Sequence, residues 1–434
     1  MSLGAALRRG QLTLRHIRRH NRVVSYWSGS QASAYSTAAY PARAIVDLGA
    51  IRQNVQVCLE AAPRSQVMAV VKADAYGHGL VPVALAALGA GATWLGTAQA
   101  SEALALRSAG ITTSSARILT WLNNPGAPYA DLIRAHVDIS AASIGALDAI
   151  AAAAEKVDAP AYVHIKVDTG LGRNGVMPDQ LPAFVDRALE HIENDRIIVE
   201  GLWSHLAYAD DIGHPTIARQ REIFDLDYEV LLDAGIKPHF RHIANSAATL
   251  LNPELHFELV RPGIAIYGYS PVPDVTPPSG FGLTPAMTLQ ASLATVKHVP
   301  ANTGVSYSHR YHTKEATNLG IVPLGYADGI PRHASGSEDK PGAPLLVGTG
   351  ANQRIVPIAG RVCMDQIVLD LGPDATEQSG DIVTLFGPSD GLEYGAKVPN
   401  AEDWAKAADT ISYEIITRLG VRIPRVYVGE SRDM

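Results

Sequence analysis

The chain has 434 residues, of which 47% are hydrophobic and 18% are charged, and its formal net charge is −7. This size predicts a globular protein of about two or three domains with ample core. The negative charge argues against general nucleic-acid binding, which needs a basic surface that neutralises phosphates. No apolar run is long enough to cross a bilayer, so we expect no membrane partner.

The amino-terminal segment has a composition of its own. Residues 1–46 contain several arginines and no acidic side chain. We interpret residues 1–40 as a disordered basic leader or as the product of a start codon assigned too early; an organelle transit peptide has a similar composition. His16 and His20 lie in this leader, and we expect no bound metal. The two cysteines, Cys58 and Cys363, predict reduced thiols and hence a cytoplasmic protein.

A strand followed by a helical pattern recurs along the next part of the chain. The predicted strands cover residues 67–71, 93–97, 117–121, 137–140, 162–167, 197–204, 240–244 and 257–260. Eight alternations in about 200 residues favour a (β/α)₈ barrel over a doubly wound sheet. We assign residues 41–275 to this barrel.

A connector rich in proline and glycine, residues 270–285, ends the barrel pattern. Short alternating runs follow, separated by turns, at residues 287–299, 319–323, 345–348, 354–358, 367–371 and 381–386, with helical patterns at 401–408 and 412–418. This texture predicts a mainly β domain over residues 276–434.

Lys72 follows the first barrel strand and opens a turn flanked by glycines. Most lysines in such places are solvated cations that end a strand. A desolvated lysine could instead form a Schiff base with a carbonyl substrate or with pyridoxal 5′-phosphate. Asp74, Tyr76 and His78 follow within a few residues and favour the functional interpretation.

Barrel enzymes carry their chemistry on loops at the carboxyl ends of the strands. Besides Lys72, the polar residues at these ends are Lys166 to Arg173, His205, Asn245, Ser246, Arg261 and Gly263. The loops after the seventh and eighth strands commonly hold a phosphate in barrels, and Ser246 precedes a helical pattern that could cradle an anion. A lysine across the barrel from such a site is what pyridoxal phosphate requires.

Residues 170–175 match a dinucleotide-binding pattern, G-x-G-x-x-G. That fingerprint belongs in the first β-turn-α unit of its domain, whereas this loop follows the fifth strand, so we prefer Arg173 as a direct contact to an oxyanion or phenolate. From the residues alone, Tyr307, Tyr326 and Tyr413 are interpreted as core or interface side chains.

Together these residues make the chain resemble the alanine racemase family of barrel-type pyridoxal-phosphate enzymes, over about residues 41–428. The matching motifs, in family order, are A-V-V-K-A-D-A-Y-G-H-G, K-V-D-T-G-L-G-R, S-H-L-A, A-N-S-A, R-P-G-I-A-I-Y-G, G-V-S-Y, G-Y-A-D-G, C-M-D and Y-E-I. The resemblance implies that Lys72 bonds the cofactor covalently and is one acid/base catalyst. It also implies that Tyr307, from the partner subunit, is the other.

The resemblance further assigns contacts to the cofactor. The phosphate contacts are Tyr76, Ser246, Gly263, Ile264 and Tyr413, with Asn245 beside them. His205 lies near the ring and couples to Tyr307 and Arg261. Arg261 faces the pyridine nitrogen, which stays unprotonated opposite a charged guanidinium.

The remaining implied roles concern the substrate and the assembly. Arg173 contacts the ring phenolate and the substrate carboxylate, and Met364 of the partner also contacts that carboxylate. Lys166 matches a lysine that is carbamylated in some members and holds Arg173, while Tyr326 and Asp365 match the mouth of the substrate channel. Because Tyr307 and Met364 lie in the β domain, the resemblance implies a head-to-tail homodimer with shared sites.

We therefore expect interconversion of L- and D-alanine by two bases, supplying D-alanine for peptidoglycan. The alternatives are a racemase of broader or serine preference, a barrel-type amino-acid decarboxylase, and a carrier that binds pyridoxal phosphate without turnover. The decarboxylase lacks these tyrosine motifs. A carrier is typically a barrel alone, which the segment from residue 287 to 428 argues against.

Overall fold

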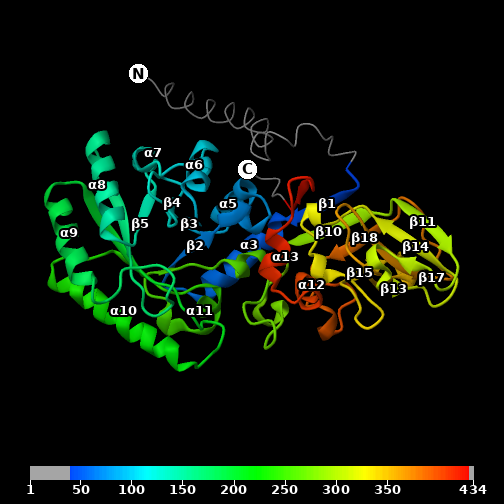
Figure 1. Ribbon diagram of the computed structural model, residues 1–434. Coiled ribbons are helices and arrows are strands. Elements are labelled where there is room, and N and C mark those ends of the chain that lie inside the picture. Colours follow the sequence, from blue (N-terminus) through cyan, green and yellow to red (C-terminus); the bar gives the residue numbers. More distant parts are fainter. Residues whose placement is uncertain (1–39, 430–434) are drawn as a thin grey trace, which may run out of the picture.

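The computed structural model describes residues 40–429, so the predicted leader, apart from Tyr40, lies outside the described residues. Figure 1 shows two parts side by side, a barrel with surrounding helices and a β-rich domain. Within residues 40–429, no helix is long and apolar enough to cross a membrane.

The barrel strands are β2 (Gln66–Val70), β3 (Trp94–Thr97), β4 (Arg117–Thr120), β5 (Asp138–Ala141), β6 (Ala161–Lys166), β7 (Ile197–Trp203), β8 (Phe240–His242) and β9 (Leu259–Val260). They form a parallel eight-stranded sheet in the order β8-β7-β6-β5-β4-β3-β2-β9. Just beyond β9 and β8, Arg261 N donates to Ala244 O at 2.9 Å and brings the two ends of the sheet together. The predicted barrel is confirmed.

Helices surround this sheet: α5 (Leu80–Gly89), α6 (Ala100–Ser108), α7 (Tyr129–Arg134), α8 (Ile144–Val157), α9 (Leu181–Glu193), α10 (Pro215–Asp233) and α11 (Ser246–Leu251). The last strand is followed by a short 3-10 helix, η3 (Ile264–Tyr267). An additional helix, α3 (Leu48–Ala61), precedes the first barrel strand and begins where Asp47 accepts from Gly49 N and Ala50 N.

The β domain, also predicted, contains a six-stranded sheet, a three-stranded sheet and a hairpin. Its strands are β10 (Met287–Ser292), β11 (Thr295–Val299), β12 (Gly304–Val305), β13 (Tyr311–His312), β14 (Thr317–Val322), β15 (Pro344–Val347), β16 (Arg354–Pro357), β17 (Ile367–Gly372), β18 (Ile382–Phe386) and β19 (Arg425–Val428). Its helices are α12 (Ala401–Ala408) and α13 (Ser412–Thr417). The inward residues of β10 alternate with half-buried ones, as expected where one face covers a core.

Strand β1 (Ala42–Asp47) lies within the segment that we assigned to the barrel, yet it pairs elsewhere. It runs antiparallel to β10, with Ala42 opposite Ala291, and parallel to β19. The β domain is thus built from both ends of the described chain. The barrel segment itself begins with α3 and β2.

Candidate active site

Lys72 begins a left-handed turn at the carboxyl end of β2. In this turn, α4 (Lys72–Tyr76), the four residues after Lys72 have φ angles between 52° and 55°. Left-handed backbone costs a non-glycine residue roughly 1–2 kcal/mol. Four such residues in succession therefore require support from the surrounding structure.

The carboxyl-terminal segment of the same chain gives that support. A Cβ at Gly77 would lie 2.4 Å from the carbonyl oxygen of Ile416 in α13, so only glycine allows this close approach. Arg425 in β19 donates from Nε to Gly77 O at 2.9 Å. The β domain therefore holds the lysine-bearing turn of its own barrel.

Two of the polar residues after Lys72 have structural roles, although their position favoured a functional interpretation. Asp74 Oδ1 accepts from Leu80 N at 2.8 Å, at the start of α5. His78 is fully buried, with Nδ1 2.9 Å from Tyr76 O. Burial lowers the pKa of His78 to about 4, so the ring is neutral at neutral pH.

Tyr76, Ser246, Gly263 and Tyr413 come together at the carboxyl end of the barrel. Ser246 Oγ accepts from Gly263 N at 2.8 Å and from Ala265 N at 3.3 Å. A Cβ at position 263 would lie 2.5 Å from the hydroxyl of Tyr76. The rings of Tyr76 and Tyr413 have centroids 6.2 Å apart. Burial raises the pKa of both phenols, so both remain neutral hydrogen-bond donors.

We call this group of residues the cradle, and the first residues of two helices complete it. Asn245 Oδ1 accepts from Ala248 N at 3.2 Å and so begins α11, and Ile264 is the first residue of η3. The first N–H groups of a helix have no acceptor within it and can bind an anion. Hydroxyl groups and free N–H groups around a position kept open by glycine fit the phosphate of pyridoxal phosphate.

Four cationic side chains lie near this cradle: Lys72, Lys166, Arg173 and Arg261. Burial, and then the charge of Arg173, lowers the pKa of Lys72. Its Nζ lies 5.8 Å from the ring centre of Trp121. A lowered pKa increases the fraction of lysine in its neutral form, and the neutral amine is the form that attacks carbonyl groups.

Arg261 is buried and bonded to neutral acceptors. Nη2 donates to Ser204 O at 2.9 Å and lies 3.4 Å from His205 Nδ1, and Nη1 lies 3.2 Å from His242 Nδ1. Burial lowers the pKa of Arg261 to about 9, which leaves the guanidinium charged at neutral pH. Burial and the surrounding cations keep the pKa of His205 well below its usual value, so His205 is neutral.

The loop that matches the dinucleotide pattern is organised by Asp168. Its carboxylate accepts from the backbone N–H groups of residues 170–173, at 2.9 to 3.1 Å. This places Arg173 near Lys72 and Lys166, whose pKa values its charge lowers. The glycines of this loop therefore allow the backbone to turn around the Asp168 carboxylate.

Two aromatic or histidine partners were missed by the sequence analysis. Trp203 lies under two cations, 4.4 Å from Lys166 Nζ and 4.9 Å from Arg261 Cζ. His242 Nδ1 lies 3.2 Å from Arg261 Nη1. Both residues end strands at the carboxyl side of the barrel, and that position was the signal that could have identified them.

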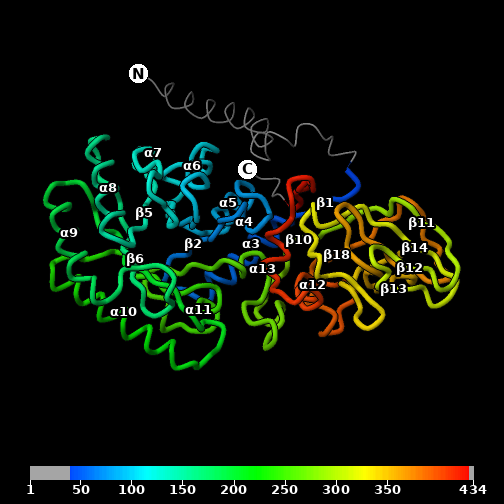
Figure 2. The backbone as a smooth tube through the Cα atoms, viewed as in Figure 1, coloured from blue at the N-terminus to red at the C-terminus, as the bar shows by residue number. Residues whose placement is uncertain are grey.

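Three of the predicted site residues of the β domain are exposed. Tyr307 is 68% exposed, Met364 53% and Tyr326 42%. In Figure 2, β12 and β13, which flank Tyr307, are well separated from α4. The backbones of these three residues are neighbours, because Ser306 Oγ lies 3.2 Å from Cys363 Sγ and Tyr326 N donates to Cys363 O at 3.0 Å.

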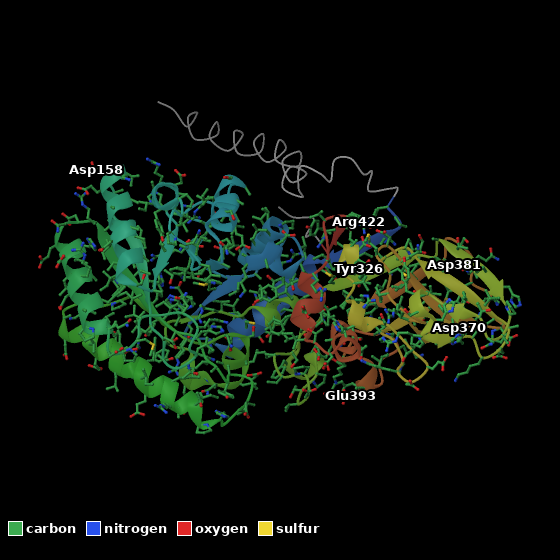
Figure 3. The ribbon with its side chains drawn as sticks, viewed as in Figure 1. Asp158, Tyr326, Asp370, Asp381, Glu393 and Arg422 are labelled. Carbon is green, nitrogen blue, oxygen red and sulfur yellow. The ribbon has the colours of Figure 1, made fainter. Side chains whose placement is uncertain are left out.

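Asp365 lies beside these residues in a small charged group. Arg422 pairs with Asp365 and with Asp328, each at 2.9 Å. Figure 3 shows Arg422 and Tyr326 on the side of the β domain that faces the barrel. Tyr413, by contrast, comes from the β domain but lies beside Tyr76 of the same chain.

The chain matches two family models described as the N-terminal and C-terminal domains of alanine racemase, at residues 46–271 and 286–427. An alanine racemase of Beutenbergia cavernae is 54% identical over 390 residues, which cover 90% of this chain and 98% of that protein. One of Streptomyces coelicolor is 52% identical over 392 residues, with 90% and 96% covered.

Solved structures are similar over the same length. Alanine racemase from Streptomyces coelicolor superimposes with a TM-score of 0.85 at 51% identity, covering 91% of this chain and 99% of that one. The enzyme from Bacillus anthracis with bound L-Ala-P has a TM-score of 0.78 at 34% identity, with 90% and 96% covered. The chain therefore belongs to the alanine racemase family.

Proposed function

We propose that the protein interconverts L- and D-alanine with pyridoxal 5′-phosphate bound through Lys72. The observation that carries the proposal is the position of Lys72, an amine of lowered pKa, near the cradle made by Tyr76, Ser246 and Gly263. When bound, the cofactor draws electrons from the substrate and so makes its α-hydrogen acidic. All other steps are performed by side chains of this chain.

Arg261 would limit how strongly the cofactor draws electrons. A charged guanidinium can only donate, so Arg261 would offer the pyridine nitrogen no proton acceptor and would leave it unprotonated. Among residues 40–429, Arg261 contacts neutral acceptors such as Ser204 O and His242 Nδ1, and no carboxylate touches it directly. A weaker electron sink favours return of the proton over side reactions such as transamination.

Racemisation needs a proton to leave one face of the α-carbon and another to arrive at the opposite face. We assign Lys72 to one face and Tyr307 of a second copy of the chain to the other. His205 supports Tyr307: because Arg261 donates toward Nδ1 of His205, the hydrogen of that neutral ring lies on Nε2. This N–H can stabilise a phenolate and so lower the barrier to proton removal.

The exposed surface around Tyr307, Met364 and Tyr326 would then be covered by the second copy. In that homodimer Arg173 and Met364 hold the substrate carboxylate, and Tyr326 and Asp365 restrict the channel mouth. A wider mouth would admit serine, which remains the second candidate substrate. We further propose that the D-alanine serves peptidoglycan synthesis in the cytoplasm.

The fit of the cofactor can be tested at Gly263. In Gly263→Ala the new Cβ lies 2.5 Å from the hydroxyl of Tyr76, whose ring is stacked on Tyr267 and cannot easily move. We expect affinity for the cofactor to fall by roughly tenfold or more, since overpacking costs about 1–3 kcal/mol. Fluorescence titration of the apoprotein measures this. Gly145→Ala, where a Cβ meets nothing within 4 Å, should bind as the wild type does.

Lys166 gives a pH-dependent prediction. Burial, then the charges of Arg261 and Arg173, lowers the pKa of Lys166 to about 8. Its neutral amine can add carbon dioxide and release one proton to form a carbamate, and the neutral fraction grows as the pH rises through that value. We expect native mass spectrometry to show one added carbon dioxide at Lys166, increasing from about pH 6 to about pH 9. Lys166→Arg should abolish the adduct, and a missing adduct in the wild type would contradict the proposal.

The function itself is tested by a chiral assay of the purified protein with pyridoxal phosphate and either L-alanine or L-serine. We expect an equal mixture of alanine enantiomers, reached faster than the corresponding serine mixture. Faster conversion of serine would establish the alternative preference. If the cofactor binds but neither substrate is racemised, the protein is a carrier or a decarboxylase instead. Release of carbon dioxide from other amino acids would distinguish the decarboxylase from the carrier.

A further inference from the structure

A line of polar side chains crosses the interior of the barrel and ends at Arg261. Arg117 and Asp138 are the first residues of β4 and β5, His164 lies within β6, and His242 ends β8. Thus the line starts at the amino ends of the strands and finishes at their carboxyl ends. Asp138, His164, His242 and Arg261 are at most 5% exposed.

Each member of the line contacts the next. Arg117 pairs with Asp138, whose Oδ2 lies 3.1 Å from His164 Nε2. His164 Nδ1 lies 2.9 Å from His242 Nε2, and His242 Nδ1 lies 3.2 Å from Arg261 Nη1. The contacts are thus continuous over five side chains.

The two ends of the line fix the direction of every hydrogen bond in it. An arginine only donates, so His242 Nδ1 must accept and the ring hydrogen lies on Nε2. That hydrogen is donated to His164 Nδ1, which places the hydrogen of His164 on Nε2. From there it is donated to the carboxylate of Asp138, which only accepts. All contacts are satisfied when both imidazoles are neutral and both carry hydrogen on Nε2.

The surrounding barrel makes room for this arrangement. A Cβ at Gly201 in β7 would lie 2.2 Å from His164 Nδ1, so the ring occupies the space that any larger residue would need. The His242 ring is stacked on Trp203, with centroids 5.5 Å apart and an interplanar angle of 9°. Trp94 packs edge-on against His164 at 5.5 Å. Neither imidazole can turn freely.

We propose that Asp138 and His164 are positioning residues that act on Arg261 through His242. Asp138 selects the tautomer of His164, and His164 selects that of His242, so that a lone pair faces the guanidinium. The opposite tautomer of His242 would set an N–H against the N–H groups of Arg261 and displace it. This inference rests on the proposed function, in which Arg261 faces the ring nitrogen of the cofactor.

Asp138→Leu is the sharpest test. Arg117 Nη2 and His164 Nε2 both contact Oδ2 of Asp138, so an asparagine oxygen at that position can still accept from both, whereas leucine offers no acceptor. In Asp138→Leu nothing at this end holds the hydrogen of His164 on Nε2, and we expect it to move to Nδ1, with that of His242 following. Nitrogen-15 NMR of histidine-labelled holoenzyme should report hydrogen on Nε2 of His242 in the wild type and in Asp138→Asn, and on Nδ1 in Asp138→Leu. We expect kcat of Asp138→Leu to fall roughly 10- to 100-fold with little change in KM.

Glu200→Gln is the matched control. Glu200 Oε2 pairs with the same Arg117 at 2.8 Å and lies 3.3 Å from His239 Nδ1, but it contacts neither imidazole of the line. The substitution removes a similar charge from the same ion-pair group. We expect the His242 tautomer to stay as in the wild type and kcat to change by less than about twofold. Equal losses in Asp138→Leu and Glu200→Gln would overturn the proposal.

A second pair of variants covers the case in which Asp138→Leu does not fold. Glutamine at position 164 can accept from His242 with its oxygen and donate to Asp138 with its NH₂, whereas leucine can do neither. We expect His164→Gln to keep the His242 tautomer and most of kcat, and His164→Leu to lose both.

The tautomer is measured without turnover, so the two proposals fail separately. A protein with hydrogen on Nε2 of His242 but no racemisation would contradict the proposed function alone. A racemase with hydrogen on Nδ1 of His242 would overturn only the positioning role proposed for Asp138 and His164.

Discussion

Replacing Lys72 by alanine is expected to abolish racemisation, with kcat/KM at least roughly 10⁴-fold lower. The variant loses both the covalent link to the cofactor and the base on one face of the substrate. The absorbance band of covalently bound cofactor should disappear, while phosphate contacts at Tyr76, Ser246 and Gly263 still permit weak binding. Spectroscopy of the reconstituted variant, alongside the chiral assay, measures both effects.

Lys72→Arg separates the covalent role of the amine from its charge. Arginine keeps a cation beside Trp121 and Arg173 but cannot form a Schiff base at neutral pH. We expect the same loss as for alanine. If either variant retained the absorbance band of covalently bound cofactor at full strength, Lys72 would not be the attachment site.

Tyr307→Phe is expected to remove the base on the other face. Because the equilibrium constant between the two enantiomers is one, conversion must slow equally in both directions. The asymmetry appears instead in exchange of the α-hydrogen with deuterated solvent. We expect L-alanine to exchange roughly 10²- to 10⁴-fold more slowly than in the wild type, while D-alanine continues to exchange through Lys72.

Tyr311→Phe is the control for this experiment. Its phenol lies in the same hairpin and donates to Asp370 Oδ2 at 2.7 Å, so its removal costs about 1 kcal/mol of stability without touching the site. Exchange should remain as in the wild type for both enantiomers. If Tyr307→Phe slowed the exchange of L- and D-alanine equally, the assignment of one base to each face would be wrong.

Much of the barrel could be predicted from the sequence because each strand is a short apolar run with its own turn signals. The predicted strand 162–167, for example, corresponds to β6 (Ala161–Lys166). Strand β1 could not be placed in this way, since its partner residues, such as Ala291, lie far along the chain. Local patterns show that a segment is extended but not which strand it will join.

The site was predictable where residue type and strand-end position coincide, as at Lys72 and Arg261. The left-handed turn after Lys72 was not, because three of its four residues have side chains with no preference for that backbone and the support comes from Arg425. The contacts that join His164 and His242 could not be predicted from the sequence either. They depend on which inward positions of separate strands face each other, and that is set by the register of the barrel.

In the proposed homodimer, each active site combines Lys72 of one chain with Tyr307 of the other. Mixing inactive Lys72→Ala and Tyr307→Phe proteins under conditions that exchange subunits tests this arrangement. In a hybrid dimer one site carries both substitutions and the other carries neither. If half of the dimers are hybrids, we predict recovery of about a quarter of the wild-type activity. No recovery, with hybrids confirmed by native mass spectrometry, would show that each site is built within one chain.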